Sequence, residues 1–441
     1  MTETTEPNRE KRHIVICCDG TGNEISDNLS NVLKLYRTLR KTEKTHPNQL
    51  VFYDPGVGTL ERPDPFHRFK QNFNLVIGLA FGYGLDDNVL ASYQFIVENH
   101  REGDDIYLFG FSRGAYTVRV LAALIHKIGL ISLPQNNLAG SGLTAYKQFS
   151  TDKVAPDQKD DPAAQYARIL SVKWPTVKFV GVWDTVASVI VPRWDRINPA
   201  KLQFSPWSLE ELAFIRENPS IEIFRQAISI DERRRMFRPQ PWDAGKFRPH
   251  RYAPESTWKD QDSVQVWFAG VHSDVGGGYP EAESALSKYP LLWMIEEAVK
   301  HGLKVDRRTV NQLGWGRKRK NSPFNYVAPD YLPYPGNPAS RDWQPHDSMN
   351  AGWRVLEAFP KKDTYKEWPE RKSMFGYYIP CSEPRLIPEG ALIHQSVIDK
   401  IAQDKTYQPV NMPARYTPVP METPPAPGSA DDAVEDDGVG A

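Results

Sequence analysis

The chain has 441 residues, with 54 Lys and Arg against 55 Asp and Glu and a formal net charge of -1. Because 40% of the residues are hydrophobic and 11% are aromatic, the chain can bury a large core, which excludes global disorder. The charge balance shows no basic surplus of the kind that nucleic-acid-binding proteins carry. We therefore expect a folded domain with insertions and no nucleic-acid partner.

The cysteines and the N-terminus bear on where the protein works. Cys17, Cys18 and Cys381 form no spaced set with histidine that would bind zinc, and so few thiols suit a reducing compartment. Residues 1–12 are polar and lack the apolar core of a signal peptide, and no apolar run approaches the ~20 residues of a membrane-spanning helix. We expect a disordered leader at 1–12 and a protein that is cytoplasmic or exported without a signal peptide.

Five short apolar runs predict strands that are buried on both faces. They are rich in β-branched and aromatic residues and cover residues 13–23, 49–59, 104–114, 177–185 and 264–274. Helical patterns lie between some of these runs. Those at residues 31–41 and 85–100 have one apolar face, and that at 115–130 is nearly all apolar, as a central helix under a sheet would be. Strands that alternate with helices predict an α/β fold with a doubly wound, mostly parallel sheet.

Irregular segments interrupt this alternation. Those near 131–175, 190–260 and 305–390 are loop-like or rich in Pro, Trp, Tyr and Arg, and we interpret them as lid-like insertions above the carboxyl ends of the strands. The folded catalytic domain would then span residues 13–400. Residues 411–441 are Pro-rich and then acidic, which predicts a disordered tail.

The residues GFSRG at 110–114 match the pattern G-x-S-x-G. An apolar run precedes them and an apolar helical pattern follows them, as in the strand–turn–helix of a nucleophile elbow. Gly110 and Gly114 leave room for the close passage of strand and helix, and the sharp turn strains the serine backbone. We predict that Ser112 is a nucleophile at the positive end of a helix dipole; the alternative is a serine that caps an ordinary βα turn.

A serine nucleophile needs a base and a carboxylate that orients the base. Asp184 directly follows an apolar strand, where a buried charge is costly without a partner, so it is the candidate acid; its alternative role is a helix N-cap. His272 follows another apolar strand and precedes three glycines, which makes it the candidate base, with His346 and His394 in reserve. The chain order serine, aspartate, histidine is that of α/β-hydrolases.

The turn after the first strand contains candidates for an oxyanion hole. The backbone N–H groups of Gly20 and Thr21 are possible donors together with that of Arg113, and the alternative is a plain glycine-rich turn capped by Asp19. Asp274 either orients the candidate base or binds an ion, and calcium at Asp19 or Asp274 stays open. The chemistry itself requires no cofactor, and no metal site is predicted.

The combined motifs resemble the type VI secretion phospholipase-effector catalytic-domain family, long catalogued as an uncharacterised α/β-hydrolase-like domain. Over about residues 11–400, the resemblance is carried by CCDGTGN, GLDDNVLASYQFI, DDIYLFGFSRGAYTVRVLA, VGVWDTVAS, IDERRRMFRP and VWFAGVHSDVGGGY. It implies an α/β-hydrolase fold, a triad that falls on Ser112, Asp184 and His272, and hydrolysis of phospholipid acyl esters. One departure is Gln226 in RQAISIDE, where the family pattern leads us to expect a histidine-containing run.

These observations together predict a serine hydrolase that cleaves carboxylic esters, with phospholipid acyl esters as the implied substrates. If the substrate is a lipid, aromatic residues of the insertions, such as Trp194, Trp207 and Trp242, are expected to touch the bilayer surface. The alternative is a non-catalytic module that keeps the α/β-hydrolase fold and binds a partner through its Trp-rich insertions.

Overall fold

The computed structural model describes residues 11–20, 28–56, 84–152, 161–186, 190–192, 207–209, 212–319, 322, 325–329, 344–358, 360–363 and 366–423. A central sheet of eight strands has the order β17-β16-β12-β9-β6-β3-β1-β2, and every neighbouring pair in it runs parallel. Its strands are β1 (His13–Cys18), β2 (Gln49–Asp54), β3 (Asp105–Phe111), β6 (Val177–Trp183), β9 (Ile221–Ser229), β12 (Asp262–Phe268), β16 (Ala391–His394) and β17 (Tyr416–Val419).

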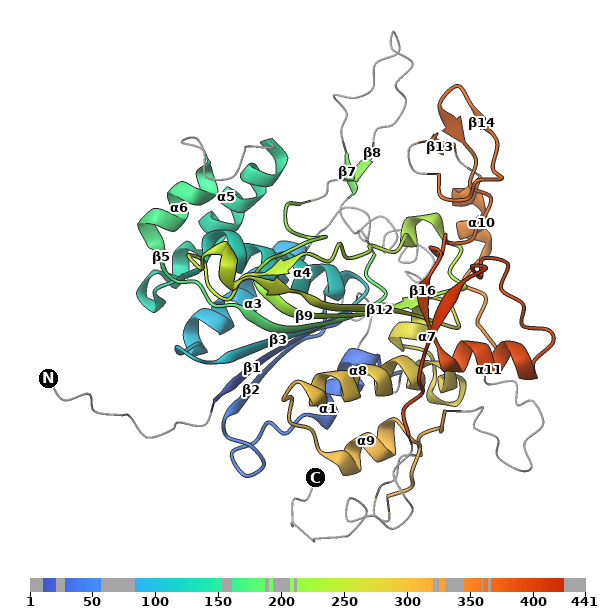
Figure 1. The fold of residues 1–441 in the computed structure, drawn as a ribbon, viewed down its shortest axis with the longest axis horizontal. Helices are drawn as coiled ribbons and strands as arrows, with labels where there is room; N and C mark the ends of the chain where they lie inside the picture. The colour runs from blue at the N-terminus through green and yellow to red at the C-terminus, as the bar shows by residue number, and fades with distance from the viewer. Residues whose placement is uncertain are drawn as a thin grey trace, which may run out of the picture.

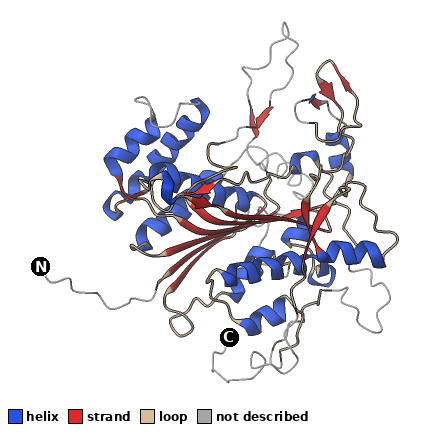
Figure 2. Ribbon diagram, viewed as in Figure 1, coloured by secondary structure: helices blue, strands red, loops and turns tan. Residues whose placement is uncertain are grey.

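Helices cover both faces of this sheet (Figures 1 and 2). On one face lie α3 (Leu85–Asn99), α4 (Arg113–Ile128), α5 (Ala139–Asp152) and α6 (Pro162–Leu170), and on the other lie α1 (Asn31–Thr38), α8 (Lys288–Lys300) and α9 (Arg307–Leu313). Within the described residues, the other α-helices are α7 (His272–Gly276), α10 (Ala351–Glu357) and α11 (Gln395–Gln403). The doubly wound α/β fold of the hydrolase type, with its parallel sheet, is therefore confirmed.

Small antiparallel sheets lie outside this frame. They pair β4 (Leu130–Ile131) with β5 (Ser171–Lys173), β7 (Ile190–Pro192) with β8 (Trp207–Leu209), β10 (Lys246–Phe247) with β11 (Lys259–Asp260), and both β13 (Lys361–Lys362) and β14 (Ser373–Met374) with β15 (Tyr377–Tyr378). Within the described ranges, no helix combines the length and the apolar character that crossing a membrane requires.

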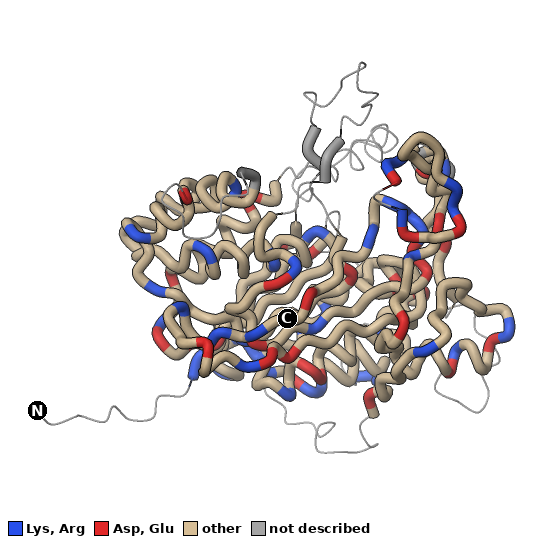
Figure 3. The backbone as a smooth tube through the Cα atoms, turned by 45° about the horizontal axis from the view of Figure 1, so that its top comes forward, with Lys and Arg blue, Asp and Glu red and all other residues tan. Residues whose placement is uncertain are grey.

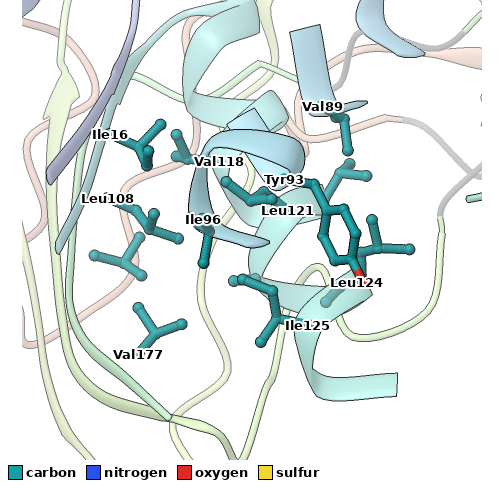
Figure 4. Close-up of a cluster of buried hydrophobic side chains, with 14 of the residues drawn as sticks. Ile16, Val89, Tyr93, Ile96, Leu108, Val118, Leu121, Leu124, Ile125 and Val177 are labelled. Atoms are coloured by element: carbon teal, nitrogen blue, oxygen red, sulfur yellow. The ribbon is translucent and has the colours of Figure 1, made fainter. Parts of the chain in front are cut away.

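A buried apolar layer on each face fixes the helices to the sheet. Figure 4 shows the layer under α3 and α4, where strand residues face helix residues; it labels Ile16, Leu108 and Val177 from the sheet, Val89, Tyr93 and Ile96 from α3, and Val118, Leu121, Leu124 and Ile125 from α4. Every residue of α4 is buried. Because burying one such aliphatic side chain is worth about 1.5–3 kcal/mol, this layer holds α4 firmly against the strand that precedes it.

The segment predicted as an insertion at 190–260 contains a central strand of the sheet, which corrects that prediction. β9 lies between β6 and β12. Arg225 and Gln226 stand in the middle of β9 and break the apolar run, which is why the pattern did not indicate a strand. Both side chains are buried and paired, since Arg225 forms ion pairs with Asp262 and Glu297.

The described residues of the predicted insertion at 131–175 do not form a lid. Its two helices, α5 and α6, join the layer beside α4, and Tyr146 and Phe149 of α5 belong to the same buried cluster as α3 and α4. An apolar stripe on each helix is what lets them pack there. The described parts of this segment, 131–152 and 161–175, therefore belong to the helical layer on one face of the sheet.

The chain ends are ordered further outward than predicted. Arg12, inside the predicted leader 1–12, forms an ion pair with Asp104 at 2.6 Å, whereas residues 1–10 lie outside the described residues. In the predicted tail 411–441, β17 extends the central sheet and the buried Asn411 side chain donates two hydrogen bonds to backbone carbonyls. The predicted tail is thus wrong for residues 411–423, and residues 424–441 lie outside the described residues.

Candidate active site

Ser112 occupies the sharp turn between β3 and α4. Its φ and ψ angles are 56° and -119°, and its N–H donates to Trp183 O at 3.1 Å. The flanking glycines are required by contact, because a Cβ atom on Gly110 would collide with the backbone of Gly114, and one on Gly114 would collide with the carbonyl of Cys18. The residues GFSRG therefore form the predicted elbow, at the carboxyl end of β3 and beside the end of β1.

His272 lies directly against the serine. It begins α7, four residues after β12 ends, and its Nε2 is 2.8 Å from Ser112 Oγ. Its Nδ1 is 2.5 Å from Asp184 Oδ2. Because a carboxylate can only accept, Nδ1 carries the proton and Nε2 is the acceptor for the serine hydroxyl. The structure thus brings the three predicted residues, Ser112, Asp184 and His272, into one hydrogen-bonded chain.

Two aromatic rings enclose the imidazole. Phe111 lies 4.7 Å from the His272 ring centroid and Phe237 lies 4.9 Å from it, edge-on. Trp353 of α10 packs on Phe237 in turn, so the insertion predicted at 305–390 contributes to the wall of the site. Burial lowers the pKa of His272, while the hydrogen bond to Asp184 acts in the opposite sense. The pKa is lowered on balance, which favours the neutral imidazole that can accept a proton.

Asp184 follows β6 and is completely buried, with a positive φ of 41°. Besides His272, its carboxylate accepts hydrogen bonds from the N–H of Ser229 at 2.9 Å and from both terminal nitrogens of Arg385 at 2.6 and 3.0 Å. Burial would raise the pKa of this carboxyl, but the Arg385 charge and the His272 hydrogen bond together hold the pKa below its ordinary value. Asp184 is thus a paired, ionised acid; residues 187–189, on which its alternative role as a helix N-cap depends, lie outside the described residues.

Arg385 is the residue at this site that the sequence did not indicate. It lies on the segment between β15 and β16, is buried, and reaches Asp184 across 201 positions of the chain. The surrounding residues, CSEPRLIPEG, match no motif and lack periodicity. The one indirect signal is the buried position of Asp184 at a strand end, because a fully buried aspartate there needs a cationic partner as well as a neutral histidine.

The structure places the three predicted oxyanion-hole donors in different situations. Arg113 is the first residue of α4, which places its N–H at the positive end of the helix and next to the serine. The N–H of Gly20 donates to Asp19 Oδ1 at 2.7 Å, so Gly20 does not offer the donor that was predicted. Thr21 lies outside the described residues.

The predicted supporting residues Asp19 and Asp274 have structural partners. Asp19 accepts from the hydroxyls of Ser30 and Tyr53, which tie the end of β1 to α1 and β2. Asp274 accepts from the N–H of Val271, where α7 begins, and contacts His346 at 2.6 Å. Asp274 therefore shapes the helix that bears the imidazole and does not contact the ring itself, whose nitrogens Ser112 and Asp184 occupy.

The reserve histidines bond elsewhere. His346 lies between Asp274 and Glu283, and Nδ1 of His394 contacts Ser396 Oγ at 2.6 Å. Over the part of the chain that the structure describes, no group of three or more His, Cys, Asp or Glu side chains is arranged to bind a metal ion.

Comparison with known proteins identifies the family. A family model described as the catalytic domain of Tle1-like phospholipase effectors of type VI secretion systems matches residues 12–297. The chain belongs to this family. The matched region runs from the start of β1 into α8, so it contains Ser112, Asp184 and His272 and ends before Arg385.

A further relative matches part of the chain. An uncharacterised protein of Saccharomyces cerevisiae is 27% identical over 238 residues, which are 52% of this chain and 32% of that protein. The chain therefore spans about a third of this relative's length.

Three solved structures show low similarity. An uncharacterised protein from Pseudomonas aeruginosa has a TM-score of 0.36 at 19% identity, over 67% of this chain and 46% of that one. The Tle1 effector bound to the VgrG spike of a type VI secretion system has a TM-score of 0.29 at 18% identity, over 63% and 52%. The metagenomic carboxyl esterase MGS0156 has a TM-score of 0.27 at 9% identity, over 68% and 80%.

Proposed function

We propose that the protein is a serine hydrolase that cleaves carboxylic esters, with Ser112 as nucleophile, His272 as general base and Asp184 as the orienting acid. One observation carries the proposal, namely the continuous path from Ser112 Oγ to His272 Nε2 at 2.8 Å and from His272 Nδ1 to Asp184 Oδ2 at 2.5 Å. Both distances are within hydrogen-bond reach, which is the geometric requirement for an activated serine. Membership of a phospholipase-effector family supports the same chemistry.

The proposed reaction transfers an acyl group to water. Ser112 Oγ attacks the ester carbonyl while His272 Nε2 takes the hydroxyl proton, and the protonated imidazole then gives this proton to the departing alcohol. A water molecule, deprotonated by the same imidazole, releases the acid and restores the serine. The ionised Asp184 keeps Nδ1 protonated throughout and stabilises the imidazolium.

The proposed oxyanion site lies at the start of α4. The N–H of Arg113, the residue after the serine, belongs to the positive end of a 16-residue helix, where negative charge is stabilised. Cys18 and Asp19, at the end of β1, lie against Gly114 at the elbow and so border this oxyanion site. The N–H of Gly20 is bonded to Asp19 and does not act as a second donor there.

We propose phospholipid acyl esters as the substrate class, on the basis of the family. The residues predicted to touch the bilayer need correction, because Trp242 is buried and stacks on Phe224 at 4.2 Å. Trp194 and the side chain of Trp207 lie outside the described residues.

A different surface suits contact with lipid. At the turn between β14 and β15, the side chains of Met374 and Phe375 are 72% and 93% exposed. Figure 3 shows Lys and Arg, interspersed with Asp and Glu, along the lobe that carries this turn, and Lys372 beside it is also exposed. Apolar side chains next to basic ones fit a phospholipid surface, and the lobe adjoins the proposed triad, because Tyr378 of β15 contacts Arg235 two residues before Phe237.

Labelling with a fluorophosphonate probe tests the nucleophile whatever ester the protein cleaves. We expect the wild-type protein to be labelled and Ser112→Ala to lose labelling, while Ser150→Ala, which removes a hydroxyl on α5, is labelled like the wild type. In an ester panel from short nitrophenyl esters to phospholipids, Ser112→Ala should reduce turnover by about 10⁴-fold or more. Labelling that survives Ser112→Ala would refute the assignment of Ser112 as nucleophile, whereas a wild-type protein that is not labelled would favour the non-catalytic alternative.

A further inference from the structure

We propose that Arg385 is a positioning residue of the Ser112–His272–Asp184 triad, which holds the Asp184 carboxylate in one plane and supplies its permanent counter-charge. This inference rests on the proposed function. Arg385 lies outside the region that the family model matches, so it depends on a C-terminal segment of this chain.

The contact between the two side chains is a two-point clamp. Nη1 of Arg385 donates to Asp184 Oδ1 at 2.6 Å and Nη2 donates to Oδ2 at 3.0 Å. Oδ2 is also the oxygen that accepts from His272 Nδ1. Because a guanidinium donates in a rigid planar fork, it fixes the rotation of the carboxylate and therefore the direction in which His272 is held.

The clamp is itself anchored. Nη1 of Arg385 also donates to Ser229 Oγ at 2.6 Å and Ser229 O at 3.0 Å, and Nη2 donates to Phe237 O. The backbone carbonyl of Arg385 accepts from Asn411 Nδ2 at 3.0 Å. The guanidinium thus has little freedom to move, which a positioning role requires.

The charge of Arg385 matters because both Arg385 and Asp184 are buried. A buried carboxylate without a cation would be destabilised, and it would also raise the basicity of the histidine beside it. Among the described residues, the other charged groups that act on this pair are Glu232 and Arg234, which pair with each other, and Glu367 near Arg385. Removing the guanidinium leaves the net charge around His272 more negative by one, which favours imidazolium over imidazole.

A second buried arginine provides a matched control. Arg225 also makes a two-point contact, with Asp262 Oδ1 at 2.8 Å and Oδ2 at 3.0 Å, and its side chain is 5% exposed against 4% for Arg385. Asp262 begins β12, whereas His272 follows the other end of that strand. The Asp262 side chain is 46% exposed, whereas Asp184 is fully buried, so losing Arg225 removes the two-point ion pair of a buried arginine with a half-exposed carboxylate, at the opposite edge of the sheet.

The test measures the rate at which a fluorophosphonate labels Ser112, from pH 4 to pH 9, in full-length variants whose melting temperatures are also recorded. In Arg385→Met, we expect slower labelling, with the acid limb of the profile moved to higher pH by about one unit, because His272 becomes more basic. In Arg385→Lys, the charge remains but the fork is lost, so labelling slows about tenfold or more while the limb stays in place. Arg225→Met should keep the wild-type rate and limb even if it melts at a lower temperature.

Each outcome decides. Wild-type labelling and an unmoved limb in Arg385→Met overturn the proposal, and so does an equal loss in Arg225→Met, which would reduce the effect to stability. Should Arg385→Met not fold, Arg385→Lys decides, because slower labelling with an unmoved limb supports the proposal and wild-type labelling overturns it. If the wild-type protein is not labelled at Ser112, the proposed function itself is wrong. This result differs from failure of the Arg385 proposal, in which the wild-type protein is labelled.

Discussion

Two residues of the proposed triad have backbone angles that residues other than glycine seldom adopt. Ser112 has a φ of 56° and Asp184 a φ of 41°, and such conformations cost about 1–3 kcal/mol each. Neighbouring strands hold both residues in place, since the N–H of Ser112 donates to Trp183 O and that of Asp184 donates to Ala227 O. The strained backbone therefore lowers folding stability at the two positions from which the Ser112 and Asp184 side chains leave the carboxyl edge of the sheet.

The elbow glycines lead to a prediction about single methyl groups. A Cβ atom on Gly114 would overlap the backbone at Cys18 and Asp19, which cannot retreat because β1 lies inside the sheet. We expect Gly114→Ala to destabilise the fold by about 1–3 kcal/mol or more and to abolish labelling of Ser112 by the fluorophosphonate. Denaturant unfolding followed by tryptophan fluorescence measures the first effect.

Gly140→Ala is the matched control, because a Cβ atom there comes no closer than 4.0 Å to Leu90 Cδ1. Gly140 lies in α5, so alanine should leave stability unchanged or raise it by up to about 1 kcal/mol. Equal unfolding midpoints for the two variants would show that the elbow tolerates a side chain, contrary to the argument from contact.

Residues at the site differ in how far the sequence predicts them. Ser112, Asp184 and His272 each follow an apolar strand, and parallel strands bring their carboxyl ends to one edge, so their convergence is predictable from the pattern. Arg385 follows no strand and belongs to no motif, because its position is set by tertiary contacts with Asp184 and Asn411. Gly20 could not be assigned from sequence either, since its N–H direction depends on the Asp19 side chain.

Among the elements, strands with a continuous apolar run were predicted from the sequence, whereas a strand whose apolar run is interrupted by polar residues was missed. The five predicted runs contain β1, β2, β3 and β6 in full and all of β12 except its first two residues. β9 was missed because Arg225 and Gln226 are acceptable in a buried strand only when distant partners satisfy them, and Arg119 of α4 is the partner of Gln226. β16 and β17 have only four residues each, too short for a periodic pattern to stand out.

The turn between β14 and β15 carries the prediction about lipid binding. Replacing Met374 and Phe375 by serine removes two exposed apolar side chains and should weaken binding to phospholipid vesicles by about tenfold or more, because each side chain contributes about 1–2 kcal/mol on transfer from water. Cosedimentation with zwitterionic and with anionic vesicles measures the loss.

The control for this pair is Ile169→Ser, which removes a side chain of α6 that is 79% exposed in the helical layer away from β14. It should bind vesicles like the wild type. If the Met374/Phe375 double variant binds as well as Ile169→Ser, the turn does not contact lipid. If it still cleaves soluble short-chain esters normally, the defect lies in lipid contact and leaves the triad intact.

At the scale of the whole molecule, the C-terminal segment connects the edge of the sheet to the proposed triad. The family match ends at residue 297, yet β16 and β17 continue the parallel sheet and Arg385 reaches Asp184 from the same segment. Asn411 joins the two parts, because its side chain donates to both Ile230 O and Arg385 O. The proposed triad of this chain is therefore in contact with residues well beyond the matched region.

Two truncations test whether the proposed triad depends on these residues. Deleting residues 411–441 removes Asn411, β17 and the contact of Glu422 with His394, so we expect a melting temperature lower by at least about 2–4 °C and slower fluorophosphonate labelling of Ser112. Deleting only 424–441 leaves all of these contacts and should preserve both the melting temperature and the labelling rate. The comparison isolates residues 411–423, since the two proteins differ in nothing else. Equal labelling in both would mean that Arg385 stays against Asp184 without Asn411, and the clamp would then be set by Ser229 and Phe237 alone.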